Sequence, residues 1–315
     1  MLGLLLAGLL TFVELNCENL FDCVHDSLKQ DEEFLPEGSY HWTRSRYWLK
    51  VNHIAQELAA CGGPEMQMPG LIALCEVEND SVLTDLTRRS LLRKMGYEYL
   101  MTHSPDARGI DVALVYKPQT FVLVRSYALR VPLVKHMRPT RDILYASGRI
   151  ISGDTLHVFV VHAPSRLGGE VASRPFRMQV AKILCLAIDS LKALNADARI
   201  IVAGDFNDYA SGKSLSFICT HGMTDVSAQA LGRNGAKGTY RYHGEWGSLD
   251  HILVSNSLLK AVAECYVADE PFLLEDDEKY GGKKPRRNYL GPKYLGGFSD
   301  HLPLVAKFRI TDSEE

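Results

Sequence analysis

The stretch Ile200-Ile201-Val202-Ala203-Gly204-Asp205-Phe206-Asn207-Asp208 is the most informative part of this sequence. An apolar run of this length that ends in turn-forming residues is typical of a buried strand. Side chains two residues apart on an extended chain share a face, so Asp205 and Asn207 are expected to point the same way. Phe206 would then anchor the opposite side. Because Gly, Asp and Asn are also common at ordinary turns, a functional interpretation requires other strands that end in the same polar way.

Five further apolar segments, each predicted to be a strand, begin or end next to a polar residue. These segments are residues 11–16, 71–75, 156–161, 248–254 and 304–310. The polar residues at or beside their ends are Asn16, Glu76, His162, Asp250, Asp300 and His301. Carboxylate and amide oxygens are hard ligands that suit Mg²⁺ or Mn²⁺ better than zinc. Together with histidines that transfer protons, such a group favours metal-assisted hydrolysis of a phosphate ester.

The composition limits the alternatives. The chain has 315 residues, 46% of them hydrophobic, and a net charge of −3, which is typical of a globular protein without broad affinity for nucleic acid. We find no repeat, low-complexity tract or flexible linker, so we expect one domain over residues 11–312. The sequence lacks a GxSxG motif, a phosphate-binding lysine loop and a dinucleotide fingerprint. Attack by water with the help of a metal is therefore the leading mechanism.

The compartment stays open at this stage. The seven cysteines are scattered and contain no CxxC pair, which argues against disulfides and structural zinc and slightly favours the cytoplasm. Cys75, Cys185 and Cys265 are expected to be small core residues. Residues 1–10 are an apolar lead-in, too short to span a membrane as a helix. If this lead-in is the remnant of an export signal, the protein would act outside the cytoplasm.

Helical patterns separate the strands. They cover residues 45–61, 80–95, 174–194 and 212–221, with Asn79 or Asp80 as a helix cap and Gly96 as a stop signal. This alternation predicts an α/β fold. It is compatible with a doubly wound parallel sheet and also with two sheets packed face to face.

The polar strand ends occur in motifs that resemble those of the endonuclease/exonuclease/phosphatase superfamily, in its deoxyribonuclease-like branch. The motifs, in the family's order, are ELNCENLFD, LCEVEN, VVHAPSR, GDFND, SLDHI and FSDHLPL. Each motif is weak alone, but the ordered set is specific and covers about residues 11–310. The resemblance implies a four-layer sandwich in which two mixed β-sheets pack face to face, flanked by helices.

The resemblance also implies a metal site and a proton acceptor. Glu76 would be the principal ligand of Mg²⁺ or Mn²⁺, with Asn16 and Asp300 close to the metal. His301 would be the general base that takes a proton from the attacking water. Asp250 would hold the His301 ring in the required tautomer, as carboxylates do in other enzymes.

Three more residues would surround the phosphate. Asp205, Asn207 and His162 would stabilise the pentacovalent transition state and help to protonate the leaving oxygen. The resemblance thus implies a phosphodiesterase, with an endonuclease-like enzyme as the leading interpretation and DNA or RNA as candidate substrates. No obligate protein partner or transmembrane segment is evident.

Two other functions remain open. One is a phosphatase or phospholipase-type hydrolase that acts on a small phosphoester or a lipid headgroup, because fold does not determine substrate. The other, from a different class, is an inactive module that binds a phosphorylated ligand. The intact set of polar motif residues argues against this module.

Several polar residues near the motifs have a structural interpretation. His251 follows Asp250 on a strand, so it faces the opposite side and is expected to be structural. Arg108 is expected either to pair with Asp111 or to lie in a plain loop. Arg138 and Arg141 are more simply explained as a solvated connector than as phosphate ligands. The acidic and then basic loop at residues 275–293 could act as a lid or specificity element.

Overall fold

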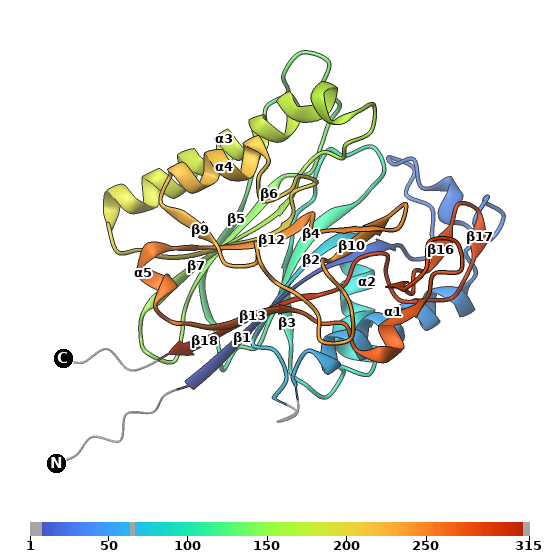
Figure 1. Ribbon diagram of the computed structural model, residues 1–315, viewed down its shortest axis with the longest axis horizontal. Coiled ribbons are helices and arrows are strands. Elements are labelled where there is room, and N and C mark those ends of the chain that lie inside the picture. The colour runs from blue at the N-terminus through green and yellow to red at the C-terminus, as the bar shows by residue number, and fades with distance from the viewer. Residues whose placement is uncertain (1–7, 64–66, 311–315) are drawn as a thin grey trace.

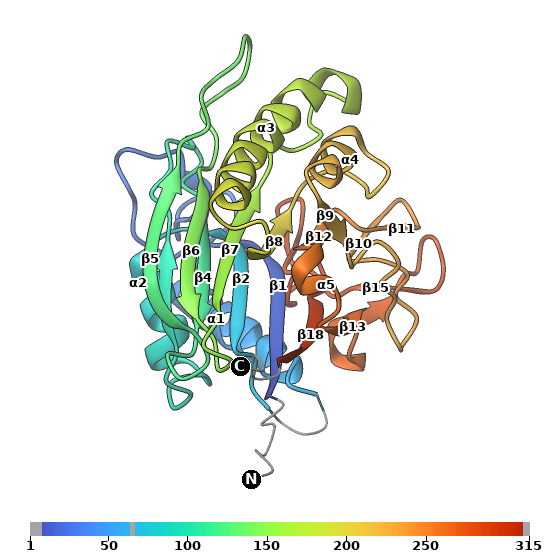
Figure 2. The same ribbon diagram turned by 90° about the vertical axis from the view of Figure 1, so that its left-hand side faces the viewer.

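Two six-stranded β-sheets pack face to face in the computed structural model, which describes residues 8–63 and 67–310 (Figures 1 and 2). The first sheet has the order β13-β18-β1-β2-β4-β3, and the second has the order β5-β6-β7-β8-β12-β9. The first sheet contains β1 (Gly8–Leu20), β2 (Leu71–Val77), β3 (Glu98–Met101), β4 (Asp111–Tyr116), β13 (Val262–Val267) and β18 (Leu304–Ile310). The second contains β5 (Val122–Leu129), β6 (Ile143–Arg149), β7 (Thr155–His162), β8 (Arg199–Asp205), β9 (Met223–Asp225) and β12 (Asp250–Ser255).

Helices cover the outer face of each sheet. On the first sheet lie α1 (Arg44–Ala60), α2 (Asp80–Thr84) and a π-helical turn, η2 (Asp85–Arg89). On the second lie α3 (Glu170–Leu194) and α4 (Lys213–Thr220), with the short α5 (Asn256–Leu259) after β12 (Figure 1). Both sheets are mixed, because β1/β2 and β7/β8 are parallel whereas the other neighbouring strands are antiparallel. This four-layer arrangement confirms the sandwich and excludes the doubly wound parallel sheet.

The alternation of side chains along each strand explains the layers. On β7, Val158 and Val160 face the first sheet, whereas Phe159 and Val161 pack against the helices. Successive residues of a strand point to opposite faces, so a strand that is buried on both sides is apolar throughout. The predicted strand at residues 200–204 has this pattern and forms β8.

Two helix predictions had different outcomes. The helix expected at residues 45–61 is α1, which begins after the Thr43 cap. The helix expected at residues 80–95 is shorter than predicted: Asn79 caps α2 by accepting a hydrogen bond from the Val82 amide, and η2 continues the helical segment to Arg89, but residues 90–95 form turns. The helix breaks because the Ser90 hydroxyl donates to the Leu86 carbonyl and accepts from the Leu92 amide. Such side-chain bonds replace helical backbone bonds.

The topology brings the polar strand ends to one edge of the sandwich. The carboxyl ends of parallel β1 and β2 meet at this edge, and so do those of β7 and β8. Across the second sheet, His162 pairs in register with Asp205, and Asp205 pairs with Asp250. These three residues therefore form a row at the end of the sheet.

The segments that precede β12 and β18 add further structure at this edge. A hairpin of β10 (Tyr240–Tyr242) and β11 (Glu245–Gly247) forms a bridge from Tyr240 to His301. The segment that includes the loop expected at residues 275–293 forms two small hairpins, β14 (Leu274–Asp276) with β15 (Lys283–Pro285) and β16 (Tyr289–Leu290) with β17 (Lys293–Tyr294). Two 3₁₀ turns complete the elements, η1 (Glu32–Phe34) and η3 (Pro271–Leu273).

The N-terminal lead-in is partly integrated into the fold. Gly8, Leu9 and Leu10 pair with the end of β18, and Leu10 is buried between the sheets, whereas residues 1–7 lie outside the described residues. All seven cysteines are free; Cys75 and Cys185 are buried as expected, and Cys265 is only half-buried. Within residues 8–63 and 67–310, no helix combines the length and apolar composition needed to cross a bilayer.

Candidate active site

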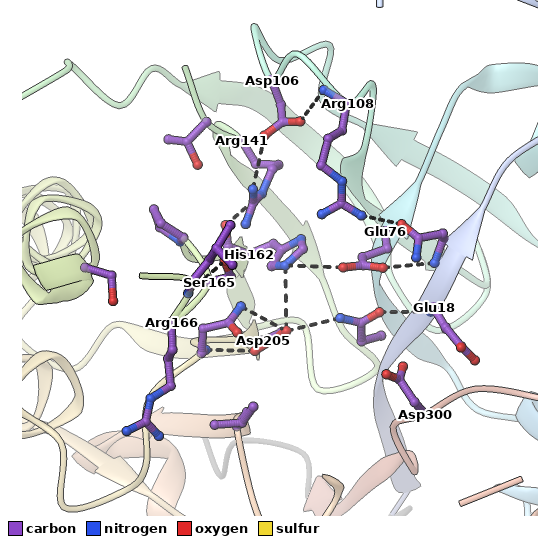
Figure 3. A pocket seen from close by; sticks show the side chains of 18 of the residues that line it. Glu18, Glu76, Asp106, Arg108, Arg141, His162, Ser165, Arg166, Asp205 and Asp300 are labelled. Atoms are coloured by element: carbon purple, nitrogen blue, oxygen red, sulfur yellow. Dashed lines mark hydrogen bonds and ion pairs between the residues drawn. The ribbon is translucent and has the colours of Figure 1, made fainter. Parts of the chain in front are cut away.

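A cleft of about 1120 Å³ opens at the polar edge of the sandwich. Seven of the eight predicted site residues line it, and the eighth, Asp250, is fully buried behind His301. The cleft thus brings together residues from β1, β2, β7, β8 and the segment before β18 (Figure 3).

Asp205 is the centre of the site. Its Oδ1 accepts a hydrogen bond from the Asn207 amide at 2.7 Å, and its Oδ2 accepts from Asn16 Nδ2 at 3.1 Å and Asn207 Nδ2 at 3.2 Å. Asn207 has a φ of 49°, so a left-handed turn, and not an extended chain, aligns it with Asp205. Burial and the nearby Asp250 carboxylate raise the pKa of Asp205 to about 7. A carboxyl group with this pKa can both donate and accept protons near neutrality.

His301 and Asp250 form a buried pair. The His301 Nδ1 lies 2.7 Å from Asp250 Oδ2, which also accepts a hydrogen bond from the Thr239 hydroxyl. Burial lowers the pKa of His301, but the Asp250 carboxylate and its hydrogen bond outweigh this effect, so the pKa is well above its usual value. Tyr240 lies beside the imidazole, with the two ring centroids 4.9 Å apart. Asp250 thus holds the Nδ1 of His301, and the Nε2 atom remains able to exchange a proton in the cleft.

His162 is buried between two carboxylates. Its Nε2 lies 3.6 Å from Asp205 Oδ2 and 3.8 Å from Glu76 Oε1. Burial, reinforced by Arg141 and Arg108, holds the pKa of His162 well below its usual value. The ring is therefore neutral near pH 7, in contrast to His301.

Glu76, the last residue but one of β2, has a left-handed conformation with a φ of 60°. Its Oε2 accepts a hydrogen bond from the Asn19 amide at 2.9 Å, and its Oε1 faces His162. The Asn19 side chain in turn accepts a hydrogen bond from Arg108, which lines the cleft. The carboxylate is thus fixed at the centre of the cleft, between the two sheets.

Asp300 lies on the first-sheet side, next to Glu18 (Figure 3). Its Oδ2 accepts a hydrogen bond from Arg287 Nη2 at 3.0 Å, and the Arg287 Nε lies 3.5 Å from Glu18 Oε1. Glu18 is 6% exposed and was not among the predicted site residues. The two carboxylates and the arginine form a charged group beside Asn16.

The donors present fit a hard divalent cation. Glu76, Glu18, Asp300 and Asn16 supply carboxylate and amide oxygens on one side of the cleft, the ligands that Mg²⁺ and Mn²⁺ prefer. A second possible group, Asp205, Asp250 and His301, places ligand atoms within 4.8 Å of one another. A cation there would compete with the proton shared by His301 and Asp250. The Glu76 side is therefore the better metal site.

Buried polar atoms lie directly beneath the site. Both oxygens of Glu14 on β1 and the Oδ1 of Asp250 have no hydrogen-bond partner among the described residues. Glu14 is fully buried, and burial together with Asp250 and Asp205 raises its pKa well above its usual value. A protonated Glu14 limits the negative charge under the cleft.

One of the three arginines near the site, Arg141, differs from what we expected. Arg141 is not a solvated connector: it is buried, pairs with Asp106 at 3.1 Å and donates to the carbonyls of His162 and Ala163. Arg108 does not pair with Asp111, which instead accepts hydrogen bonds from Thr102 and Ser104. Arg138 is exposed at the rim of the cleft. Nothing local in the sequence distinguishes Arg141 from Arg138, because only the tertiary contacts differ.

The structural interpretation of His251 is consistent with its position. The residue is fully buried on the far face of β12, where Nδ1 lies 2.8 Å from Asp225 Oδ2 and Nε2 lies 3.0 Å from the Asp208 carbonyl. This second Asp–His pair has the same geometry as the pair in the cleft but no access to it. It thus provides an internal control for the function of His301.

Comparisons with known proteins agree with the fold and the motifs. The model of the "Endonuclease/Exonuclease/phosphatase family" matches residues 11–309. No curated protein matches the chain at a significant level.

Solved structures show the same fold. A family protein from Bacteroides thetaiotaomicron is 17% identical with a TM-score of 0.63, and the match covers 96% of each chain. A mannosyl-6-phosphatase from the same species is 18% identical with a TM-score of 0.62, covering 96% of this chain and 100% of that one. The human Nocturnin catalytic domain, determined with a bound sulfate anion, is 18% identical with a TM-score of 0.57, covering 96% and 97%.

Proposed function

This chain belongs to the endonuclease/exonuclease/phosphatase family, and we propose that it is a divalent-metal-dependent phosphoesterase that cleaves phosphodiester bonds as an endonuclease-like enzyme. The observation that carries the proposal is the convergence of Glu76, His162, Asp205 and His301 in one cleft. A carboxylate-paired histidine, a neutral histidine and a carboxyl group with a pKa of about 7 supply the proton acceptor and donors that acid–base hydrolysis of a phosphate ester uses.

The metal would be Mg²⁺ or Mn²⁺, held by Glu76 with Asn16 and Asp300 close by. When bound, such a cation polarises the phosphoryl oxygen and offsets the charge that develops on it. Glu76 is held by the Asn19 amide, so its carboxylate is already oriented toward the cleft. Preorganised ligands of this kind need little rearrangement on binding.

Residues of the second sheet would carry the proton transfers. In its neutral form, His301 accepts the proton of the attacking water at Nε2, while Asp250 holds Nδ1 and stabilises the imidazolium that forms. Because the pKa of His301 is raised, this neutral form becomes more populated as the pH rises. Asp205, with its pKa of about 7, delivers a proton to the leaving oxygen. Neutral His162 donates a hydrogen bond to a phosphoryl oxygen, and Asn207 holds the Asp205 carboxyl group beside the phosphate.

The cleft supports a substrate that extends beyond a single phosphate. Its volume of about 1120 Å³ exceeds the range of about 300–1,000 Å³ typical of drug-sized ligands. Arg108, Arg138 and Arg166 line it, and exposed Tyr209 and Tyr242 are suited to stacking on bases. An unpaired or flexible strand of nucleic acid combines both features, whereas a small phosphomonoester would use only part of the cleft.

A hydrolysis panel with Mg²⁺, Mn²⁺ or EDTA tests this proposal. The substrates are supercoiled DNA, single-stranded DNA, RNA, bis-p-nitrophenyl phosphate, p-nitrophenyl phosphate and sphingomyelin. The variants Asp205→Asn and His301→Gln remove the acid and the base, and Asp225→Asn is the control outside the cleft.

We expect metal-dependent cleavage of a nucleic acid that both site variants lose by at least about 10²-fold and the control retains. Turnover of the monoester or of sphingomyelin alone would replace the endonuclease assignment with a phosphatase or phospholipase. Binding of the substrates without any turnover would support the inactive module.

A further inference from the structure

Arg287 pairs with the two carboxylates, Glu18 and Asp300, on the first-sheet side of the cleft. Its guanidinium donates from Nη2 to Asp300 Oδ2 at 3.0 Å and lies with Nε 3.5 Å from Glu18 Oε1. The Nε atom is buried and has no hydrogen-bond partner among the described residues. The arginine therefore sits between two carboxylates without saturating its own donors.

The backbone that carries Arg287 is fixed independently of the guanidinium. Glu18 accepts hydrogen bonds from the amides of Asn288 at 2.7 Å and Tyr289 at 3.2 Å. On the other side, Gly297 packs so closely that an added Cβ would lie 2.2 Å from the Arg287 carbonyl oxygen. Any rearrangement at this position is thus confined to the arginine side chain.

A divalent cation and this guanidinium require the same oxygens. Asp300 is a proposed metal ligand, and Glu18 lies beside it with a carboxylate that is 6% exposed. Hard divalent cations and arginine both bind carboxylate oxygens strongly, but two cations cannot share one oxygen at close range without repulsion. The site thus contains a cation of its own where the metal would add a second.

We propose that Arg287 competes with the divalent cation for the Glu18–Asp300 carboxylate pair, so that binding of the cation displaces the guanidinium from Asp300. The arginine then acts as a positioning residue that keeps the two carboxylates paired before the metal arrives. This inference rests on the proposed function only in taking Asp300 as a metal ligand. It predicts that metal affinity is lower than the carboxylates alone would give.

The test measures Mn²⁺ binding to the metal-free full-length protein without substrate, by electron paramagnetic resonance of free Mn²⁺. The variant is Arg287→Gln, and the matched control is Arg286→Gln. Arg286 is the neighbouring residue, is exposed, and its guanidinium lies 5.8 Å from the Phe298 ring centroid. Both variants remove one positive charge, one residue apart, but only Arg287 contacts the carboxylates in the described part of the chain.

We expect Arg287→Gln to bind Mn²⁺ about five- to thirtyfold more tightly than the wild type, and Arg286→Gln to stay within about twofold. In EDTA, Arg287→Gln should melt at a lower temperature than the wild type, because two unpaired carboxylates repel each other. Added Mn²⁺ should raise its melting temperature by more than that of the wild type.

Mn²⁺ binding by Arg287→Gln that is no tighter than that of the wild type would overturn the proposal. An equal gain in affinity in Arg286→Gln would also overturn it, because it would indicate only a long-range effect of the lost charge. Absence of Mn²⁺ binding in all three proteins would also overturn it. Arg287→Lys serves if the glutamine variant does not fold; it keeps the charge but loses the planar fork, so we expect a smaller gain in affinity. A protein that shows the expected Mn²⁺ binding but hydrolyses nothing in the panel would separate this inference from the proposed function.

Discussion

Replacing Asp250 with Asn removes one negative charge from the pair with His301 and changes the size of the side chain very little. The Asp250 Oδ2 lies 2.7 Å from His301 Nδ1, and both residues are buried. A hydrogen bond to a charged group contributes about 1.5–3 kcal/mol. The variant should therefore shift the balance between imidazolium and imidazole by about 10- to 150-fold.

The sign of the pH effect follows from the charge. The Asp250 carboxylate favours the imidazolium and raises the pKa of His301, so its removal lowers that pKa. A general base is active when deprotonated, so activity rises with pH through its pKa. In Asp250→Asn we expect this rising limb of the pH–rate profile to move to lower pH. We also expect kcat to fall by about 10²- to 10⁴-fold, because the imidazolium formed during turnover is no longer stabilised.

The assay is the pH dependence of kcat with the best substrate of the panel, together with NMR titration of the His301 ring in the metal-free protein. Asp225→Asn is the matched control, because Asp225 pairs with His251 at 2.8 Å in the same way but outside the cleft. We expect the control to lose stability and keep its pH–rate profile. If Asp250→Asn kept kcat within about threefold and an unshifted profile, Asp250 would not act on His301 as described. A falling limb that moves with His301 would instead identify this residue as an acid.

Three further predictions follow from single residues. Burial raises the pKa of Glu57 to about 8, so the stability that its protonated form contributes is present below about pH 4.5 and is lost as the pH rises to 8. In melting curves from pH 4 to 9, Glu57→Gln should remove this pH-dependent loss, which is on the order of a few kcal/mol, and an unchanged slope would contradict the prediction. Gly204→Ala should lower the free energy of unfolding in urea by at least about 3 kcal/mol, because the φ of Gly204 is 144° and a Cβ would lie 1.8 Å from the Val161 carbonyl oxygen. Gly96→Ala is the control: its φ is 70° and the space around it is open, so it should cost only about 1 kcal/mol, and equal costs would refute the steric argument. Glu76→Gln should weaken Mn²⁺ binding by at least about tenfold, measured by calorimetry, and an unchanged affinity would move the metal to the Asp205 side.

The elements with strong local signals were predictable. The stretch at residues 200–205 is apolar on both faces, and this pattern alone indicates a strand buried between two layers. The stripe on α1, with buried Tyr47, Val51, Ile54 and Leu58, has the helical period. The edge strand β13 lacked such a signal, because it is only partly buried and its residues do not alternate cleanly.

In the candidate site, the residues at strand ends were predictable, and those that depend on distant contacts were not. Asp205, His301 and Glu76 stand next to apolar strands, and a strand end is a local feature that a motif can describe. Arg141, Arg287 and Glu18 are also charged, but the sequence around them does not indicate their roles. Their roles depend on neighbours that are distant in the sequence: Glu18 binds amides 270 and 271 residues away.

The amino-acid sequence by itself determined which residues can carry the chemistry and which strands present them, because strand period, turn residues and donor type are local properties. Tertiary structure alone decided the charge states and the pairing. Only packing of the two sheets lowers the pKa of His162 and raises that of His301, although both are buried histidines beside carboxylates. The physical reason is that desolvation and Coulomb interactions act through space, so they depend on which distant segments the fold brings within a few ångströms.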